Sequence, residues 1–127
     1  MDIEQTDNGT LENWTPDEVA KAFAKNEIIL IDVRTPQEFA LERITGALLA
    51  PMQSFQADHM PDQNSKQIVF HCGSGVRSAK VAEQVLKAGA DRIAHMAGGF
   101  VAWKDSGLPY MGTDVSTGGP KEMKKSG

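Results

Sequence analysis

Residues 67–86, QIVFHCGSGVRSAKVAEQVL, place the only cysteine of the chain between two patterns of different period. Residues 68–70 are continuously apolar, which is typical of a parallel strand that is buried on both faces. From residue 79 onward, apolar residues recur at intervals of three and four, as on one face of an amphipathic helix. A strand, a glycine-containing turn and a helix therefore meet at Cys72.

Similar signals flank this unit. The pattern Thr-Pro-x-Glu, an N-cap followed by proline and a capping glutamate, starts at Thr15 and again at Thr35 and predicts two helix starts. Strands alternating with helices predict an α/β fold with a central, mostly parallel sheet of about five strands and helices on both faces. The expected strands include residues 28–31, 47–49, 68–71 and 93–96, and the expected helices cover 15–25, 35–43, 53–59, 77–88 and 100–104.

The length of 127 residues suits one domain. Residues 1–12 are polar and are expected to form a flexible leader, and residues 13–109 to form the domain. Residues 110–127 lack apolar periodicity and are expected to be a disordered tail.

Composition excludes several classes of protein. The net charge of −4 argues against binding to nucleic acid or to an anionic membrane surface. A single cysteine rules out an internal disulfide and argues against a multi-cysteine zinc site, so we expect neither a metal nor a cofactor. Because no signal peptide and no apolar run of membrane length is present, a cytoplasmic location is expected.

Several features around Cys72 favour its thiolate, which is the reactive form of a cysteine. A free thiol has a pKa of about 8.5 and is little ionised at neutral pH. The following helix directs its positive end at the loop. Gly73 and Gly75 let successive N–H groups converge on one point, and Arg77 adds a full charge. The loop therefore predicts a socket for an anionic sulfur or for an anion brought to it.

A structural role for Cys72 is the alternative, because free cysteines are often simply buried and glycines often only form turns. We favour a functional role, since the strand, the glycines, the arginine and the helix start occur in the order that an anion cradle needs.

None of the three histidines is expected to be a general base for Cys72. His71 is adjacent, but alternation along the strand turns its side chain to the opposite face, where packing or hydrogen bonding is expected. His59 and His95 lack a partner pattern and are expected to be structural. A thiolate with neither a base nor a resolving thiol suits sulfur transfer through a persulfide or phosphoryl transfer through a phosphocysteine.

Loop length favours sulfur transfer. Four residues, 73–76, separate Cys72 from Arg77, and cysteine phosphatases, which the run resembles, carry one more. The additional residue enlarges the ring to hold a tetrahedral phosphoryl group, whereas the shorter ring suits a terminal sulfur atom.

Three segments together resemble a single rhodanese domain, the sulfurtransferase family, over residues 14–109. The first contains Asp32, Val33 and Arg34, continues with Glu38 and Phe39, and ends with residues 43–47, RITGA. The second is the loop at residues 71–78, HCGSGVRS, and the third is GGFVAW at residues 98–103. Three such segments in the same order make the resemblance specific.

The resemblance implies that Cys72 is the catalytic nucleophile and takes a sulfane sulfur from a donor such as thiosulfate. An external acceptor, cyanide or a small or protein thiol, then removes that sulfur. The persulfide would be held by the loop residues Gly73, Ser74, Gly75, Val76, Arg77 and Ser78. Arg77 either binds an anionic donor, which we favour, or braces the loop.

Other residues of these segments have expected supporting roles. Asp32, Arg34 and Glu38 are expected to be structural, with an Arg34–Glu38 ion pair fastening the strand end to the next helix. Gly98 and Gly99 are expected to serve backbone geometry, and Trp103 to fill the core.

Alternatives to this function remain open. Gly73 and Ser74 are small and neutral, as in mercaptopyruvate-type loops, so weak thiosulfate activity or a persulfide donor would fit. The second hypothesis is a small cysteine phosphatase or arsenate-handling enzyme. The third is a persulfide-sensing or partner-binding module with little turnover.

Overall fold

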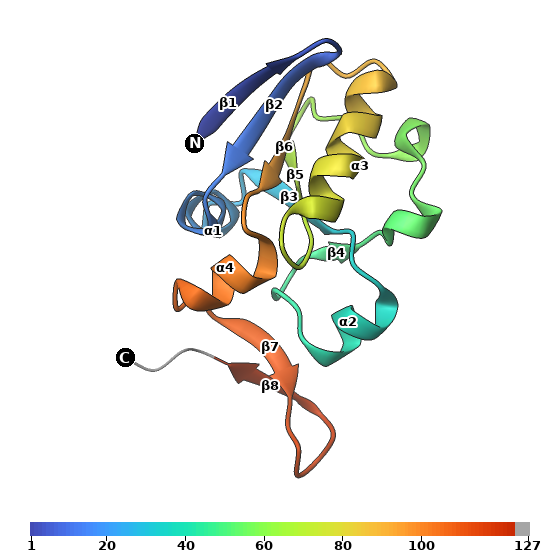
Figure 1. Cartoon of the computed structure of the whole chain (residues 1–127). Helices are drawn as coiled ribbons and strands as arrows, with labels where there is room; N and C mark the ends of the chain where they lie inside the picture. The colour runs from blue at the N-terminus through green and yellow to red at the C-terminus, as the bar shows by residue number, and fades with distance from the viewer. Residues whose placement is uncertain (124–127) are drawn as a thin grey trace.

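A computed structural model, which describes residues 1–123, places a six-stranded sheet at the centre of the molecule (Figure 1). The strand order is β1-β2-β6-β5-β3-β4; β1 and β2 are antiparallel, and the other neighbours are parallel. The predicted mostly parallel α/β sheet with flanking helices is confirmed, with six strands in place of about five. The strands are β1 Asp2–Thr6, β2 Gly9–Trp14, β3 Ile28–Asp32, β4 Leu48–Leu49, β5 Gln67–His71 and β6 Arg92–Met96.

Helices cover both faces of this sheet, and each face has its own apolar cluster. Val81 and Val85 of α3 pack against one face, whereas Val19 of α1 and Trp103 of α4 pack against the other. Figure 1 shows α1 and α3 on opposite sides of the sheet. No helix within residues 1–123 has the length and apolar character needed to cross a bilayer. The α-helices are α1 Pro16–Ala24, α2 Pro36–Leu41, α3 Val76–Lys87 and α4 Gly99–Asp105.

Both predicted capping boxes form. The Thr15 hydroxyl accepts from the Glu18 amide at 3.2 Å, and the Glu18 carboxylate accepts from the Thr15 amide at 2.9 Å. Thr35 and Glu38 repeat the arrangement at 3.2 and 3.0 Å. Each box satisfies amides at a helix start that have no partner within the helix, so α1 and α2 begin where the sequence predicts.

The segment expected to form one helix at residues 53–59 instead forms two short 3₁₀ helices, η1 Met52–Ser54 and η2 Ala57–His59. Phe55 and Gln56 between them have extended backbone angles. Phe55 packs edge-on against Phe70 of β5 with ring centroids 5.5 Å apart. This connection therefore follows the core rather than a regular helical axis.

The prediction of a flexible leader at residues 1–12 is wrong. Residues 2–14 form the β1–β2 hairpin, in which β2 extends the sheet alongside β6 and Leu11 and Trp14 are buried. The turn contains Asp7, Asn8 and Gly9, and the φ of Gly9 is +142°. A glycine after Asp and Asn between two extended runs is a hairpin signal, which the polar composition of the segment hid.

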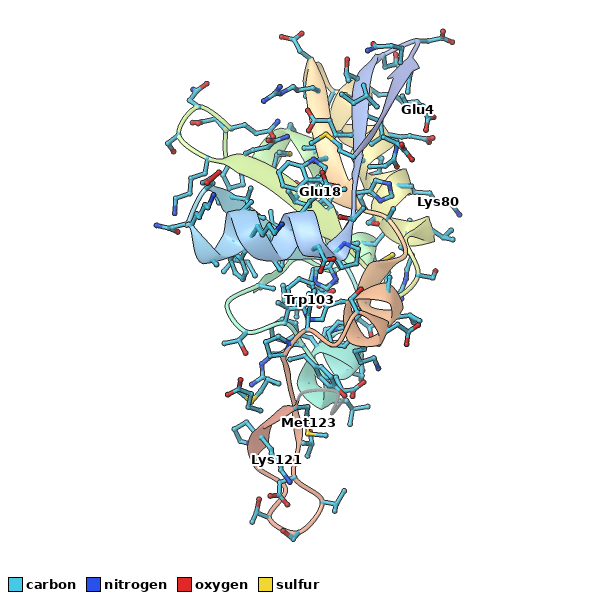
Figure 2. The ribbon with its side chains drawn as sticks, turned by 90° about the vertical axis from the view of Figure 1, so that its left-hand side faces the viewer. Glu4, Glu18, Lys80, Trp103, Lys121 and Met123 are labelled. Carbon is cyan, nitrogen blue, oxygen red and sulfur yellow. The ribbon has the colours of Figure 1, made fainter. Side chains whose placement is uncertain are left out.

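The prediction of a disordered tail after residue 109 is also wrong for residues 110–123. They form a second hairpin, β7 Tyr110–Thr113 and β8 Pro120–Met123, which extends from the body of the molecule (Figures 1 and 2). Backbone hydrogen bonds of 2.8 and 2.7 Å join Arg43 to Met111 and anchor its first strand. Residues 124–127 of the predicted tail lie outside the described residues.

Candidate active site

Cys72 follows β5 and precedes α3, at the carboxyl end of the parallel strands, where open α/β sheets place their ligands (Figure 1). Gly75 makes the turn possible because its φ is +102°, in the left-handed region. A Cβ atom at Gly75 would lie only 3.2 Å from the Gly98 amide nitrogen. The loop can therefore fold back over the sulfur only with glycine at this position.

Backbone amides surround the sulfur of Cys72. The amide nitrogens of Gly75 and Ser78 lie 3.1 and 3.3 Å from Sγ, and the Ser78 hydroxyl oxygen lies 3.6 Å away. Burial by itself would raise the pKa of the thiol, but hydrogen bonds from Ser78, Gly75 and Ser74 outweigh it and lower that pKa below its ordinary value. Amide dipoles at a helix start thus favour the thiolate.

Cys72 is completely buried, with none of its surface exposed to solvent. Ser74 and Val76 on the outside of the loop are exposed, whereas Gly73, Gly75 and Arg77 are partly buried. The loop itself therefore separates the sulfur from solvent. In this conformation Sγ is therefore not in contact with solvent.

Arg77 is paired with Glu38 across the loop. Its Nη1 and Nη2 donate to the two carboxylate oxygens of Glu38 at 2.7 and 3.0 Å. This guanidinium lowers the pKa of Glu38 to about 2, and the carboxylate raises the pKa of Arg77. The pair links the loop to α2, so in this conformation the arginine braces the loop.

The predicted Arg34–Glu38 ion pair does not form. Arg34 instead donates to the carboxylate of Asp32, with Nη2 at 2.8 Å and Nε at 3.0 Å. Its Nη2 also donates to the Glu42 carbonyl at 2.6 Å, and its guanidinium lies 4.6 Å from the centre of the Phe100 ring. Asp32 is fully buried and needs a cationic partner, so Arg34 folds back onto the carboxyl end of β3.

His71 lies on the opposite face of the sheet from Cys72, as strand alternation predicts. Its ring packs against Phe100, with Nδ1 3.4 Å from the Cys72 carbonyl oxygen and Nε2 3.6 Å from Asp32 Oδ2. Burial lowers the pKa of His71. Because the ring contacts the backbone of Cys72 rather than its sulfur, His71 is not placed to take the thiol proton.

Gly98 and Gly99 let the start of α4 approach the loop. The Phe100 amide donates to the Cys72 carbonyl at 2.8 Å, and the Val101 amide donates to the Gly73 carbonyl at 3.1 Å. A Cβ atom at Gly99 would lie 2.6 Å from the Cys72 carbonyl oxygen. The expected backbone role of this glycine pair is confirmed. Trp103 further along α4 is buried as expected, and its ring nitrogen donates to the Pro109 carbonyl at 2.9 Å (Figure 2).

The sequence did not reveal a contact made by His95. Its Nδ1 lies 2.9 Å from the Ser78 hydroxyl oxygen, and its Nε2 lies 2.7 Å from Asn13 Oδ1. The parallel register places Asn13 beside His95, but that register is invisible without the β1–β2 hairpin. His59, by contrast, is exposed as a surface residue.

The other predicted loop residues lie around the sulfur without a further side-chain contact to it. Ser74 and Val76 are exposed. Gly73 lies close to Arg77, whose Nη2 would be 3.1 Å from a Cβ atom placed on Gly73. No group of three or more His, Cys, Asp or Glu side chains within residues 1–123 is arranged to hold a metal ion.

This fold and this loop define an α/β domain built around one activated thiol. Residues 15–106 match the family model described as Rhodanese-like domain, and the chain belongs to that family.

Relatives of the chain include proteins named for sulfur transfer. A protein of Allochromatium vinosum named sulfurtransferase is 32% identical over 85 residues, which cover 67% of this chain and 79% of that protein. An uncharacterized protein of Synechocystis is 38% identical over 89 residues, which cover 70% of this chain and 50% of that protein. The chain thus spans about half the length of this cyanobacterial relative.

Solved structures agree with the fold. A rhodanese-like domain protein from Staphylococcus aureus superposes with a TM-score of 0.65 at 33% sequence identity, covering 76% of this chain and 95% of that one. Together with the sulfurtransferase relative, this likeness supports a role within the sulfurtransferase family.

Proposed function

We propose that the chain is a sulfurtransferase that carries one sulfane sulfur atom on Cys72 as a persulfide. The observation that carries this proposal is the pair of amides, from Gly75 and Ser78, that point at a single sulfur from within a short loop. The same amides stabilise negative charge on Sγ before the reaction and during it.

The proposed reaction has two displacement steps. The Cys72 thiolate attacks the outer sulfur of thiosulfate, a sulfur–sulfur bond forms to Sγ, and sulfite leaves with the electron pair of the bond that breaks. A thiolate or cyanide acceptor then attacks the terminal sulfur and leaves the Cys72 thiolate behind. The products are an acceptor persulfide or thiocyanate. Because the sequence contains a single cysteine, the thiol acceptor in this proposal is another molecule.

Intact-mass measurement tests the first step. After incubation with thiosulfate, mercaptopyruvate or a polysulfide and removal of the reagent, we expect a mass gain of one sulfur atom. Cyanide should remove this mass and release an equal amount of thiocyanate. Cys72→Ser is the matched control and should gain nothing. A wild-type chain that gains no sulfur from any of the three donors contradicts the proposal.

The complete burial of Cys72 favours one second candidate, a persulfide-sensing or partner-binding module with little turnover. Its loop is closed, and Arg77 is occupied by Glu38 rather than by an anionic donor. Measuring sulfur loss from the loaded protein to a set of thiols separates the two candidates. Transfer to one of these thiols much faster than to free cysteine supports the enzyme. A stable persulfide with no preferred acceptor supports the module.

A cysteine phosphatase is disfavoured by the four residues between Cys72 and Arg77. Hydrolysis of an aryl phosphate that is lost in Cys72→Ser would promote that function in place of sulfur transfer.

A further inference from the structure

A continuous line of polar atoms runs from Cys72 through the sheet-facing side of α3 to β2. The Sγ atom lies 3.6 Å from Ser78 Oγ, which lies 2.9 Å from His95 Nδ1, and His95 Nε2 lies 2.7 Å from Asn13 Oδ1. Cys72, Ser78 and His95 are all buried. Three different elements thus place hydrogen-bonding groups end to end behind the loop.

The orientation of Asn13 gives this line a direction. Its amide nitrogen reaches the Asp2 carbonyl at 3.5 Å, which leaves Oδ1 facing His95. An oxygen there accepts, so His95 Nε2 carries the proton and donates, and Nδ1 of the neutral ring is free to accept from Ser78. The Ser78 hydroxyl is closer to Nδ1 than to its other acceptor, the Gly75 carbonyl, at 3.3 Å. The Cys72 thiol, the Ser78 hydroxyl and His95 Nε2–H therefore each donate to the next group in the direction of Asn13.

We propose that His95, acting through Ser78, accepts the proton of the Cys72 thiol and so sets the fraction of Cys72 that is thiolate. The S–H proton passes to Ser78 Oγ while the hydroxyl proton of Ser78 passes to His95 Nδ1. The sulfur keeps its electron pair, an N–H bond replaces the S–H bond, and nothing is oxidised or reduced. After the transfer, the Ser78 hydroxyl donates to Sγ and His95 Nδ1–H donates to Ser78 Oγ, so both hydrogen bonds between Cys72 and His95 are kept with their direction reversed. The hydrogen bond from Nε2–H to Asn13 is unchanged. His95 is a positioning residue, because it reaches the sulfur only through Ser78.

The surroundings of His95 act on this role in two directions. Burial lowers its pKa, which keeps the ring neutral before the transfer but opposes its protonated form, while the carboxylate of Glu4 on β1 acts in the opposite direction and favours that form. Asp2, on the same face of β1, is the other acidic residue on that side. The neighbour on β5 is the apolar Phe70, and Lys80 of α3 is exposed to solvent (Figure 2). The carboxylate of Glu4 thus favours the imidazolium once it forms, against the larger effect of burial.

The experiment is a pH titration of the thiolate by its ultraviolet absorbance, with Cys72→Ser as the blank that removes tyrosine absorbance. The pH profile of Cys72 alkylation by iodoacetamide provides a second readout. We expect His95→Gln to move the midpoint upward by about one pH unit and to slow alkylation near neutrality about tenfold. Ser78→Ala, which keeps the backbone amide, should have a similar effect, and the double variant should add little to either single one.

Two further variants keep the test decisive. Asn13→Asp places a carboxylate at Nε2–H, stabilises the imidazolium and should move the midpoint downward. His59→Gln, at an exposed histidine, is the matched control and should leave it unchanged. An unchanged midpoint in folded His95→Gln, or an Asn13→Asp midpoint that does not fall, overturns the inference.

The inference rests on the proposed function in taking Cys72 as the reacting thiol, yet its readout requires no sulfur transfer. A midpoint that shifts in a chain that forms no persulfide would uphold this inference and refute the proposed function. If His95→Gln forms the persulfide as well as the wild type does and has the same midpoint, the proposed function is upheld and this inference is refuted.

Discussion

At the scale of single residues, the sulfur of Cys72 is stabilised by the backbone amide dipoles of Gly75 and Ser78. The one arginine in the loop is turned toward Glu38. The position of Arg77 was predictable from the sequence, but its partner was not. Arg34 and Arg77 both lie near Glu38 in sequence or in space, and only the burial of Asp32 decides that Arg34 turns away.

A double-mutant cycle should measure the bracing pair. Glu38→Gln, Arg77→Gln and the double variant should give a measurable coupling free energy that does not exceed about 1 kcal/mol, because both side chains remain about one-third exposed and solvent screens them. Urea unfolding near pH 7 provides the free energies of the four proteins. Zero coupling would show that the pair does not hold the loop.

The acid range gives an independent test of the same pair. The pKa of Glu38 is about 2 in the folded state, below its ordinary value of 4.5, so the folded state binds this proton less readily than the unfolded state. The stabilisation is therefore complete above about pH 4.5 and is lost as the pH falls toward 2. The Arg77→Gln variant should lose less stability than the wild type across that interval.

At the scale of elements, the start of α4 supports the loop that holds the sulfur. Its first amides bind the carbonyl oxygens of Cys72 and Gly73. A short distance between two backbones requires that no side chain stands between them, which explains the glycine at position 99, where a Cβ atom would lie 2.6 Å from the backbone of Cys72 and Gly73.

The variant Gly99→Ala tests this close approach. Both a positive φ of +63° and a Cβ atom 2.6 Å from the Cys72 carbonyl oppose the substitution. Gly107→Ala is the matched control, since its φ is +78° but no atom lies within 4 Å of its Cβ position. We expect Gly107→Ala to cost about 1 kcal/mol or somewhat more from backbone strain alone. Gly99→Ala should lower the free energy of unfolding by clearly more and slow sulfur loading of Cys72. Equal losses in the two variants would contradict a close contact at Gly99.

The elements nearest the site were predictable, and those at the two ends of the chain were not. Thr15 and Thr35 mark helix starts by local hydrogen bonds between residues three apart, so their signal lies within a short window. The β1–β2 hairpin depends on pairing with β6, which lies some eighty residues further along. Polar composition alone cannot distinguish an edge hairpin from a flexible segment, because only Leu11 and Trp14 are buried along β2 as apolar residues.

At the scale of the whole molecule, two buried histidines lie on opposite faces of one sheet. His71 packs on the side of α4 and His95 on the side of α3. Burial lowers the pKa of both below the ordinary value of 6.5. Burial alone therefore favours the neutral form of both rings.

Stability should fall as the pH decreases below about 6.5. In that range the unfolded chain binds a proton on His71 that the folded chain does not, so the free energy of unfolding decreases by up to about 1.4 kcal/mol per pH unit. The stabilisation from neutral histidine is complete above the pKa that histidine has in the unfolded chain. Glu38 contributes no pH dependence above about pH 5, because its pKa lies lower in both the folded and the unfolded state. Urea unfolding between about pH 7.5 and pH 5.5 measures the slope.

Two substitutions assign that slope. His71→Asn should make it shallower, whereas His59→Gln should not change it, since His59 is exposed in the folded state as well. A free energy of unfolding that is constant over this interval would contradict the burial of neutral histidines.

The sequence by itself determined the α/β class, the starts of α1 and α2 and the loop that contains Cys72. These features follow from hydrophobic periodicity, capping residues and glycine positions, all of which act within a few residues. Only the tertiary structure decided that Arg77 pairs with Glu38, that Arg34 pairs with Asp32, and that His95 reaches Ser78. It also decided that the sulfur is fully covered. The partner of a buried polar side chain is set by sheet register and by packing between distant elements, and no local pattern contains that information.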